Sequence, residues 1–487
     1  MQEVELKFQI PLSHQKKLYQ LFLAKDASPI SLYAQYYDTP EHHLAKNNMS
    51  LRLRLEGTHW IQTLKASSHH HLERFELEVD LGALKKPTLD LEIYQSYPQA
   101  KERLQHALGK QVKNLIMQFE TDVNRLVHVI HDDHAEIEVS LDRGEIRHDQ
   151  QKLGIYEIEF ELKKGTIQDL IKCTEPWIKE YHLWLDVRSK AQRGDFLAQN
   201  LELIPPQLAT ILQLDQSDNK DSALKKIVNN CLQHLLPNTT AIAGEHYNSE
   251  HIHQTRVAIR RLRSALHVFG DWSSAADPNW QEQLATLFRQ LGSTRDRDAI
   301  TEGILPQLQQ AGAPAIQLPR VPEDDDSISI AESLRSPDFT YLILALLQFV
   351  HQPTERAKKG NLKKDIVKKL QKLHQQICQD TDQFLELDVA SRHRTRKRLK
   401  RLRYCVEFIA ALYPNKKVKN YLQSLKPAQE SLGQYNDLMV AESMFQNIVK
   451  HKQKVWFALG WIANEKQYVV QKVQKDLEIF SKTEPFW

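Results

Sequence analysis

Two carboxylates and an ammonium group share one face of the segment at the N-terminus. Glu3, Glu5 and Lys7 occupy every second position there, and apolar residues lie between them. In a β-strand, successive side chains point to opposite faces, so the three charged groups lie together. Carboxylates bind hard divalent cations, and ammonium and guanidinium groups bind phosphate oxygens. Such a face could hold a metal-bridged polyanion, although a single strand of this kind usually has only a solvated face.

The same alternation recurs along the first 165 residues. It is found in segments 51–55, 60–65, 74–79, 135–139 and 156–163. The charged positions are almost all Glu, Arg or Lys, and both signs occur on the same faces. In an open sheet these faces would be solvated, whereas in a barrel they would line an inner channel and the apolar faces would pack under outer helices. Buried charges need compensation, which a polyanion bridged by divalent cations would supply. Segments 14–23, 100–108 and 167–181 are predicted to be helical.

An ordered set of short motifs accompanies these strands. It comprises Glu3-x-Glu5-x-Lys7, Arg52-x-Arg54, Thr63-x-Lys65, Arg74-x-Glu76-x-Glu78, Arg125, Glu136-x-Glu138 with Asp142-x-Gly144, Glu157-x-Glu159-x-Glu161, and Ser189-Lys190-x-x-Arg193-Gly194. The set resembles the CYTH superfamily, the triphosphate tunnel metalloenzymes, over roughly residues 1–200. The resemblance implies an α+β domain built on an eight-stranded antiparallel β tunnel that binds a triphosphate lengthwise.

The resemblance also implies a reaction and the residues that perform it. The reaction would be metal-assisted attack of water on inorganic triphosphate, giving pyrophosphate and phosphate, with Mg²⁺ or Mn²⁺ as the cofactor. The implied metal ligands are Glu3, Glu5, Glu159 and Glu161, with Glu138 and Glu157 as further candidates. The implied substrate-binding residues are Lys7, Arg52, Arg54, Lys65, Arg125, Lys190 and Arg193, and the catalytic ones are Lys7, Lys65 and Arg54. Lys7 would orient or deprotonate the water, with Tyr37 as its partner. The sequence contains no Gly-x-x-x-x-Gly-Lys-[Ser/Thr] loop, which disfavours a P-loop mechanism.

A change of composition near residue 205 predicts a second domain. Pro205 and Pro206 disfavour both helix and central strand. Residues 1–204 carry 26 Lys and Arg against 31 Asp and Glu, and residues 205–487 carry 39 against 31. We therefore predict a tunnel domain over 1–203, a linker over 204–220 and a helical domain over 221–487, the last with an anionic partner.

A basic helix pattern occurs twice in the second domain. His253, Arg256, Arg260 and Arg263 recur 140 residues later as His393, Arg396, Lys400 and Arg403. At 100° per residue these side chains share one helix face, and apolar residues occupy the opposite face. Each copy is followed by a Leu-Gly-x-x-[Arg/Asn]-Asp motif that ends in Asp296 or Asp437, which we expect to orient cations or to cap helices. The internal repeat predicts two related helical bundles, over about 221–350 and 360–487.

This duplicated pattern resembles the CHAD domain, an all-helical module that binds inorganic polyphosphate. The implied polyphosphate-binding residues are His253, Arg256, Arg260, Arg261, Arg263, His393, Arg396, Lys397, Lys400, Arg401 and Arg403, with Arg398 beside them. Aromatic residues are not interleaved along the cationic face, so a nucleic acid partner is disfavoured. An acidic insertion at 321–327 separates the repeats, and His69–His71 is expected to form a hairpin loop.

The composition limits where the protein works. No apolar run approaches the roughly 18 residues that span a bilayer, and no signal peptide opens the chain, so no membrane partner is expected. Four distant cysteines suit reduced thiols in the cytoplasm. The sequence therefore predicts a cytoplasmic inorganic triphosphatase with a polyphosphate-binding domain. Two alternatives stay open: a polyphosphate-binding or targeting protein whose tunnel has altered activity, and a hydrolase of thiamine triphosphate or nucleoside triphosphates, or an ATP-cyclising enzyme.

Overall fold

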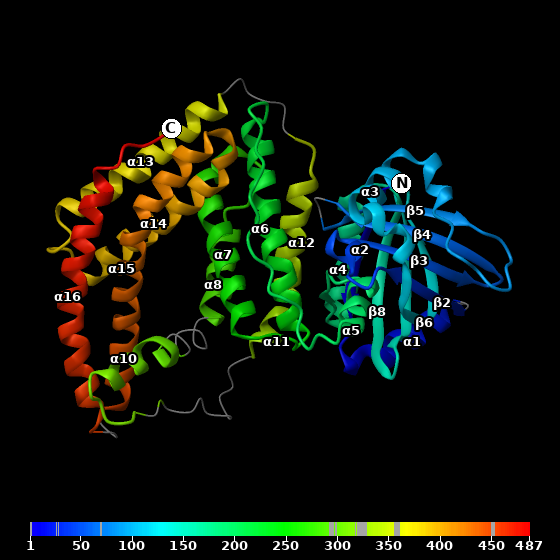
Figure 1. Cartoon of the computed structure of the whole chain (residues 1–487), viewed down its shortest axis with the longest axis horizontal. Helices are drawn as coiled ribbons and strands as arrows, with labels where there is room; N and C mark the ends of the chain where they lie inside the picture. The colour runs from blue at the N-terminus through cyan, green and yellow to red at the C-terminus, as the bar shows by residue number, and fades with distance from the viewer. Residues whose placement is uncertain are drawn as a thin grey trace. The chain divides into compact units, whose positions relative to one another are not determined.

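The computed structural model of the chain, drawn in Figure 1, describes residues 2–25, 27, 29–68, 71–291, 297, 300–316, 318, 329–354, 361–449 and 453–487. These residues form two compact units. The barrel unit consists of Met1–Pro206, Leu236–Asn248 and Ala331–His351, and the helical unit of Gln207–Leu235, Ser249–Ile330 and Gln352–Trp487. Our predicted domain limits and our two helical repeats stay predictions. The expectations for His69, His70, Asp296 and the insertion at 321–327 lie outside the described residues.

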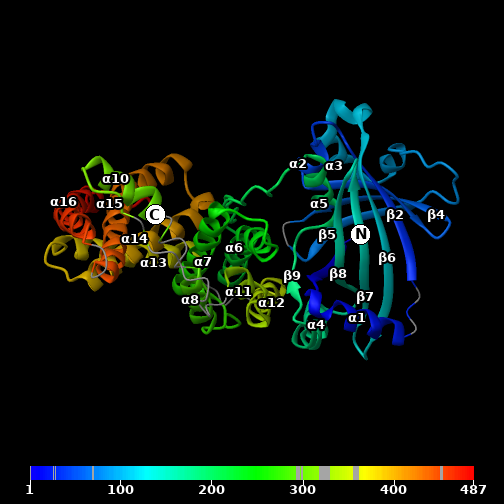
Figure 2. The same cartoon turned by 90° about the horizontal axis from the view of Figure 1, so that it is seen from below.

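The barrel unit is built on a single antiparallel sheet, whose strands β6, β7 and β8 are seen from the side in Figure 2. The strands follow the spatial order β5-β4-β3-β2-β6-β7-β8-β1-β9, and a β5–β1 pairing closes the first eight into a barrel. Their bounds are β1 Gln2–Gln9, β2 Pro29–Asp38, β3 Met49–Glu56, β4 His59–Ser67, β5 Glu73–Asp80, β6 Ile116–His131, β7 Glu136–His148, β8 Gln151–Lys164 and β9 Trp184–Leu185. The predicted eight-stranded antiparallel tunnel is confirmed.

The N-terminal strand β1 closes the barrel by dividing its pairing between two neighbours. Its first part pairs with β5, where Glu3 lies opposite Arg74. Its second part pairs with β8, where Glu5 lies opposite Glu161 and Lys7 opposite Glu159. Because directly opposed residues on one face have neighbouring side chains, this register brings the charges of three strands together at the seam.

Helices cover the outer face of the barrel at two places. Phe8 and Phe160 meet edge to face under Trp177 of α4 (Ile167–Tyr181), and Phe22 of α1 (Leu12–Ala24) packs beside that ring. A second apolar cluster joins the outer face of β3 and β4 to α2 (His43–Lys46) and α3 (Pro98–Leu108). The predicted helices over 14–23, 100–108 and 167–181 are confirmed, and the apolar faces of these strands pack as expected.

One part of the barrel interior is apolar, which the strand patterns did not predict. Leu32, Ala34, Phe119 and Val123 from β2 and β6 form a buried cluster there. Helix α5 (Lys190–Ala198) packs against this cluster through Ala191, Leu197 and Ala198. An interior apolar patch is stable here because a helix removes it from water. The interior therefore has a charged side and an apolar side, and α5 lies against the apolar one.

The remaining helices lie beyond residue 219. Their bounds are α6 Lys220–Ala243, α7 Ser249–Phe269, α8 Trp280–Gln290, a π-helical turn Ile300–Ile304, α10 Leu305–Gln310, α11 Ile330–Arg335, α12 Pro337–His351, α13 Leu362–Asp382, α14 Val389–Phe408, α15 Asn415–Ile448 and α16 Val455–Ser481. Helix α12 belongs to the barrel unit, where the Tyr341 hydroxyl donates a hydrogen bond of 3.1 Å to the Glu175 carbonyl. None of the helices within the described ranges is both long enough and apolar enough to cross a membrane.

Candidate active site

A cavity of about 670 Å³ occupies the barrel interior. Of the eleven residues implied as metal ligands or substrate-binding groups, all but Arg193 line it, namely Glu3, Glu5, Lys7, Arg52, Arg54, Lys65, Arg125, Glu159, Glu161 and Lys190. Other charged residues of the same motifs also line it, namely Arg74, Glu76, Glu78, Glu138 and Asp142. Arg193 does not line the cavity, because it is buried in the wall and bonds Glu157 at 2.5 Å. The charged strand faces therefore share one cavity, and Arg193 supports its wall.

A lysine stands at the centre of the tightest carboxylate group. Asp142, Glu157 and Glu159 place carboxylate oxygens within 4.8 Å of one another. Lys190 Nζ lies 2.6 Å from Asp142, 2.7 Å from Glu157 and 2.8 Å from Glu159. Arg125 bonds both Asp142 and Glu159 at 2.6 Å. Burial alone would raise the pKa of Glu159, but Lys190 and Arg125 hold this pKa well below its usual value. This cluster is therefore fully ionised and already neutralised by basic groups.

A second row of carboxylates crosses three strands. Glu161 lies opposite Glu5 on β1 and opposite Glu138 on β7. Burial raises the pKa of Glu161, Lys163 opposes this shift, and the negative charges of Glu3 and Glu138 add to it. Adjacent like charges destabilise a sheet unless a cation lies between them. Oxygen ligands of this kind are those that Mg²⁺ and Mn²⁺ prefer, so the donor set of this row fits a divalent cation.

The predicted metal ligands are paired with basic side chains in this structure. Lys65 bonds Glu3 at 2.9 Å, Arg74 bonds Glu5, and Lys163 bonds Glu161 at 2.7 Å. Within the described part of the chain, the tight clusters of acidic and histidine groups are Asp142–Glu157–Glu159 and Asp38–His42–Asp195. Of the four predicted ligands, only Glu159 belongs to one of them.

Strands β3 and β4 supply the basic wall of the cavity. Arg52 lies 3.7 Å from Glu76 and 3.5 Å from Glu78, and Arg54 lies 3.2 Å from Glu78. Burial lowers the pKa of the Arg54 guanidinium, and neighbouring Arg52 lowers it further. Two guanidinium groups held side by side in a low-dielectric site form a strong anion site, because each donates several hydrogen bonds in a fixed plane.

Lys7 is buried at the seam, and its ammonium group points into the wall. Its Nζ lies 3.5 Å from Glu157 and also donates a hydrogen bond to the Arg188 carbonyl. Burial lowers the pKa of Lys7, although Glu157 and Asp186 oppose that shift. A lowered pKa makes the amine a weaker base, but it increases the fraction of the lysine in the neutral form that can accept a proton. Tyr37, its predicted partner, instead donates to Gln35 at 3.0 Å.

Basic residues of the two repeated helices converge within the helical unit, where α7 and α14 pack together. Burial lowers the pKa of Lys400 to about 6, and the charges of Arg260 and Arg396 contribute. Burial also lowers the pKa of Lys397, together with Arg263 and Arg401. In both cases the charges that lower the pKa of the lysine come from α7 as well as from α14. The basic residues of the two repeats therefore lie near one another and form one surface, which we call the cationic face. Its members are Arg260, Arg263, Arg396, Lys397, Lys400 and Arg401.

Other predicted polyphosphate-binding residues have different positions. Arg261 is buried, donates a hydrogen bond of 2.8 Å to the Asn230 side chain, and stacks on Phe408. Arg256 is also buried and donates to the Leu291 carbonyl at 2.5 Å. Arg403 pairs with Glu407 at 2.7 Å. We therefore do not count these three in the cationic face.

Histidines and one further arginine complete the predicted set. His253 is half-buried on α7, and His393 is exposed on α14. Arg398 pairs with Asp380 at 2.5 Å. The cationic face thus contains fewer residues than the polyphosphate-binding set predicted from the sequence.

Comparison with known families accounts for both units. Residues 1–194 match the CYTH domain family, and residues 226–446 match the CHAD domain family. The chain combines a CYTH domain with a CHAD domain. Over 204 residues the chain is 32% identical to an inorganic triphosphatase of Haemophilus influenzae, a match that covers 40% of this chain and 55% of that protein. The chain thus spans about half the length of this curated relative.

Solved structures resemble each domain separately. The crystal structure of the CHAD domain from Ricinus communis is 28% identical, with a TM-score of 0.45, and covers 56% of this chain and 96% of that one. A putative adenylyl cyclase from Hippeastrum, described as having a dominant triphosphatase activity, is 17% identical with a TM-score of 0.30. This match covers 42% of this chain and 98% of the Hippeastrum chain.

The last motif of the CYTH domain shapes helix α5. Ser189 caps the helix by accepting a hydrogen bond of 3.0 Å from the Gln192 amide. Lys190 in the first turn reaches the carboxylate cluster. At Gly194 a Cβ atom would overlap the Phe119 ring, so this close approach requires glycine. The motif therefore places a lysine at the cluster and lets its helix lie flat on the barrel interior.

Two residues of the CYTH domain that sequence reasoning missed support the site. Asp186 is buried beside β9 and accepts hydrogen bonds from Gln9 at 2.9 Å and from Arg188. Its charge acts on Lys7. Tyr36 lies 3.5 Å from Arg52; burial raises the pKa of the phenol, but Arg52, Lys190 and Arg54 together lower it. A lone aspartate after the apolar run 183–185 was a signal for the first, whereas nothing in the alternating pattern marked the second.

Proposed function

We propose that the CYTH domain hydrolyses inorganic triphosphate to pyrophosphate and phosphate with a divalent cation, Mg²⁺ or Mn²⁺. The observation that carries this proposal is the cavity itself, in which guanidinium and ammonium groups face rows of carboxylates. A phosphate chain alone would be repelled by those carboxylates, and a metal alone would compete with the arginines for them. A metal-bound triphosphate satisfies both sets.

Each part of the wall has a role in this proposal. Glu3, Glu5 and Glu161 would hold the cation, which when bound would neutralise phosphate oxygens and polarise the phosphoryl group. Arg52, Arg54 and Lys65 donate hydrogen bonds to the phosphate chain, and Arg125 and Lys190 donate from the opposite wall. Lys7 is the proposed base, and to take the proton of the attacking water its Nζ would have to turn from Glu157 and the Arg188 carbonyl toward the cavity.

The direct experiment measures phosphate release from inorganic triphosphate, thiamine triphosphate and ATP, each with and without Mg²⁺. We expect fast, metal-dependent release from inorganic triphosphate. Faster phosphate release from thiamine triphosphate or ATP would show that the proposed substrate is wrong and that the proposed hydrolysis reaction is right. Release that needs no metal would contradict the role given to the carboxylates.

We further propose that the CHAD domain binds inorganic polyphosphate on its cationic face. The supporting observation is the convergence of basic groups from α7 and α14, where burial first, and then the charges of Arg260 and Arg396, lower the pKa of Lys400 to about 6. A polyanion would relieve the repulsion between these groups, which Asp437 beside Lys400 and Glu282 beside Arg263 already offset in part. Titration of the protein with long-chain polyphosphate at two salt concentrations tests the proposal, and a lack of binding at low salt would contradict it.

A further inference from the structure

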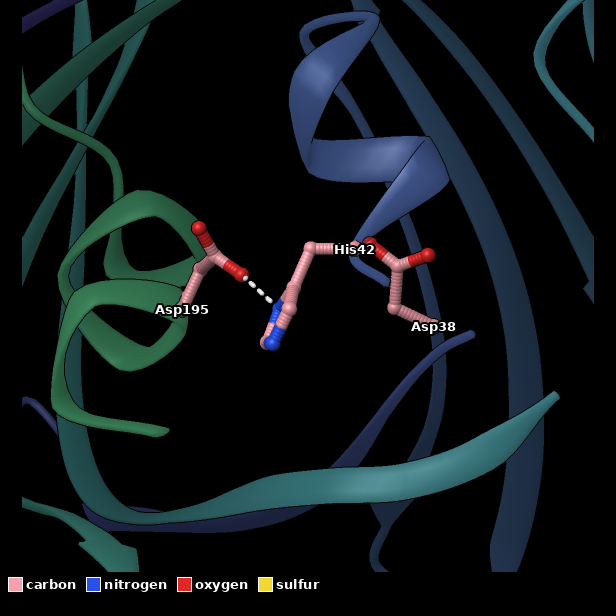
Figure 3. Close-up of side chains that lie close together, drawn as sticks. All are labelled: Asp38, His42 and Asp195. Carbon is pink, nitrogen blue, oxygen red and sulfur yellow. Dashed lines mark hydrogen bonds and ion pairs between the residues drawn. The ribbon is translucent and has the colours of Figure 1, made fainter. Parts of the chain in front are cut away.

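A histidine and an aspartate join two distant segments beside the cavity. His42 precedes α2, and its Nδ1 lies 2.6 Å from Oδ1 of Asp195 on α5, as the dashed line in Figure 3 marks. Both side chains are mostly buried, with 14% and 13% of their surface exposed. A charge-assisted hydrogen bond at this burial is stronger than one on the surface. This pair, which we call the His42–Asp195 tie, therefore connects the β2–α2 turn to helix α5.

The third residue of the group, Asp38, already has partners. Its oxygens accept hydrogen bonds from the backbone amides of Thr39 at 2.7 Å, and of Leu44 and Ala45 at 2.9 Å. Asp38 thus caps the N-terminus of α2 and fixes the turn that presents His42. Because its lone pairs are taken up in this way, a metal site formed by Asp38, His42 and Asp195 is not supported. The group is better explained as a structural connection.

Helix α5 needs such a connection. It has nine residues, and helices this short are marginal without tertiary contacts. Its first turn carries Lys190, whose ammonium group must stay among three carboxylates. Gly194 lies against Phe119, and Asp195 also accepts a hydrogen bond of 2.8 Å from Gln199. The His42–Asp195 tie is the contact that links the later turns of α5 to the turn after β2.

We propose that the His42–Asp195 tie fastens α5 against the barrel interior and thereby positions Lys190 for triphosphate. His42 is a positioning residue in this proposal, because it acts through α5 and touches no phosphate. The proposal rests on the proposed triphosphatase function for its kinetic readout. Its structural readout, the protection of α5, does not depend on that function.

The test compares His42→Asn and Asp195→Asn with His43→Asn in the full chain. His42 has a left-handed backbone with φ 58°, which asparagine tolerates, so His42→Asn removes the imidazole without added strain. His43 is the matched control, because it bonds Thr39 at 2.7 Å on the same turn and does not reach α5. Amide hydrogen exchange of residues 190–198 and kcat/KM for triphosphate with Mg²⁺ are measured for each variant.

We expect both tie variants to exchange α5 amides faster and to lose about tenfold in kcat/KM, as expected for loss of one charge-assisted hydrogen bond. His43→Asn should change neither. In a Lys190→Met background His42→Asn should cost little more, because the group that the tie positions is gone. The swapped pair His42→Asp with Asp195→His should recover part of the loss.

Three outcomes would overturn the proposal. Unchanged exchange in both tie variants would show that the tie does not fasten α5. An equal kinetic loss with and without Lys190 would show that the tie acts on another group. Faster exchange with unchanged kcat/KM would show that α5 need not be fastened for catalysis. A wild-type protein that does not hydrolyse triphosphate would contradict the proposed function, and the exchange data would still decide whether the tie fastens α5.

Discussion

The barrel interior and the cationic face contain the same basic residue types in opposite electrostatic settings. In the barrel, Lys190 lies among three carboxylates, which outweigh burial and raise its pKa. On the cationic face, Lys400 lies among arginines, and burial and these charges lower its pKa to about 6. Under the functions proposed above, a phosphate chain would enter the barrel with a compensating cation, whereas it would bind the cationic face directly. The comparison predicts metal dependence at one site and pH and salt dependence at the other.

The largest expected effect comes from removing the carboxylate row. Glu5→Gln should lower triphosphate turnover by about a thousandfold, because the cation loses a ligand where charge develops. Polyphosphate binding should be unchanged, and chelation with EDTA should have the same selective effect. Steady-state phosphate release measures the activity of the barrel, and polyphosphate titration measures binding to the cationic face.

The control for this variant is Glu180→Gln. Glu180 is an exposed carboxylate that pairs with Lys17 on the outer face of the barrel unit. Equal losses in the two variants would mean that the effect is a general one of charge. Turnover that survives Glu5→Gln would contradict the role of the row.

The next effect tests the position of α5. Gly194→Ala should displace this helix from Phe119 and lower kcat/KM by about a hundredfold, because small misplacements of catalytic groups are costly. Gly154→Ala on β8 is the matched control, since nothing lies within 4 Å of a Cβ atom built there. Retained activity in Gly194→Ala would show that the barrel interior adapts to the added methyl group.

A smaller effect is expected on the cationic face. Arg260→Ala with Lys400→Ala should weaken polyphosphate binding by about thirtyfold. The arginine contributes one charge-assisted hydrogen bond, and the lysine, which is partly neutral, contributes a weaker one. Triphosphate turnover should stay within twofold of wild type, about the error of such comparisons. Lys426→Ala with Lys472→Ala removes at least as much charge from exposed positions and serves as the control. If binding falls equally in both double variants, polyphosphate responds to the net charge of the protein and not to the cationic face.

The smallest effect is a pH dependence of polyphosphate binding. The pKa of Lys400 is lowered to about 6, so this lysine is largely neutral at pH 8 and charged below pH 6. A polyanion favours the charged form of Lys400, so binding takes up a proton and strengthens as the pH falls from 8 to 6. We expect the affinity to rise about threefold per pH unit, and one proton can raise it by at most about tenfold per unit. Lys400→Arg should flatten this dependence, because arginine stays charged. An unchanged profile in Lys400→Arg would assign the proton to another group.

The alternating strands were the most predictable part of the molecule. A period of two fixes which side chains share a face, so Glu3, Glu5, Lys7 and their counterparts could be placed in one cavity from the sequence. The pattern could not show which charges pair, since pairing depends on the register between strands. Thus Arg193, predicted to contact substrate, pairs with Glu157 in the wall.

Helical segments showed the opposite limit. The apolar period placed α1, α3 and α4, but α5 was not recognised as a helix because it is short and begins inside a charged motif. On α7, the resemblance to the CHAD domain added Arg261 to the cationic residues, whereas packing against Asn230 and Phe408 buries it. Such side chains lie near the edge of a helix face, where only the neighbouring helix decides their exposure.

The measurement that tests the central claim most directly is phosphate release from inorganic triphosphate by the wild-type chain, with Mg²⁺ and with excess EDTA. We predict rapid release with Mg²⁺ and almost none with EDTA, while polyphosphate still binds in both conditions. Release that persists in EDTA, or no release under either condition, would contradict a barrel that compensates its carboxylates with a metal-bound substrate.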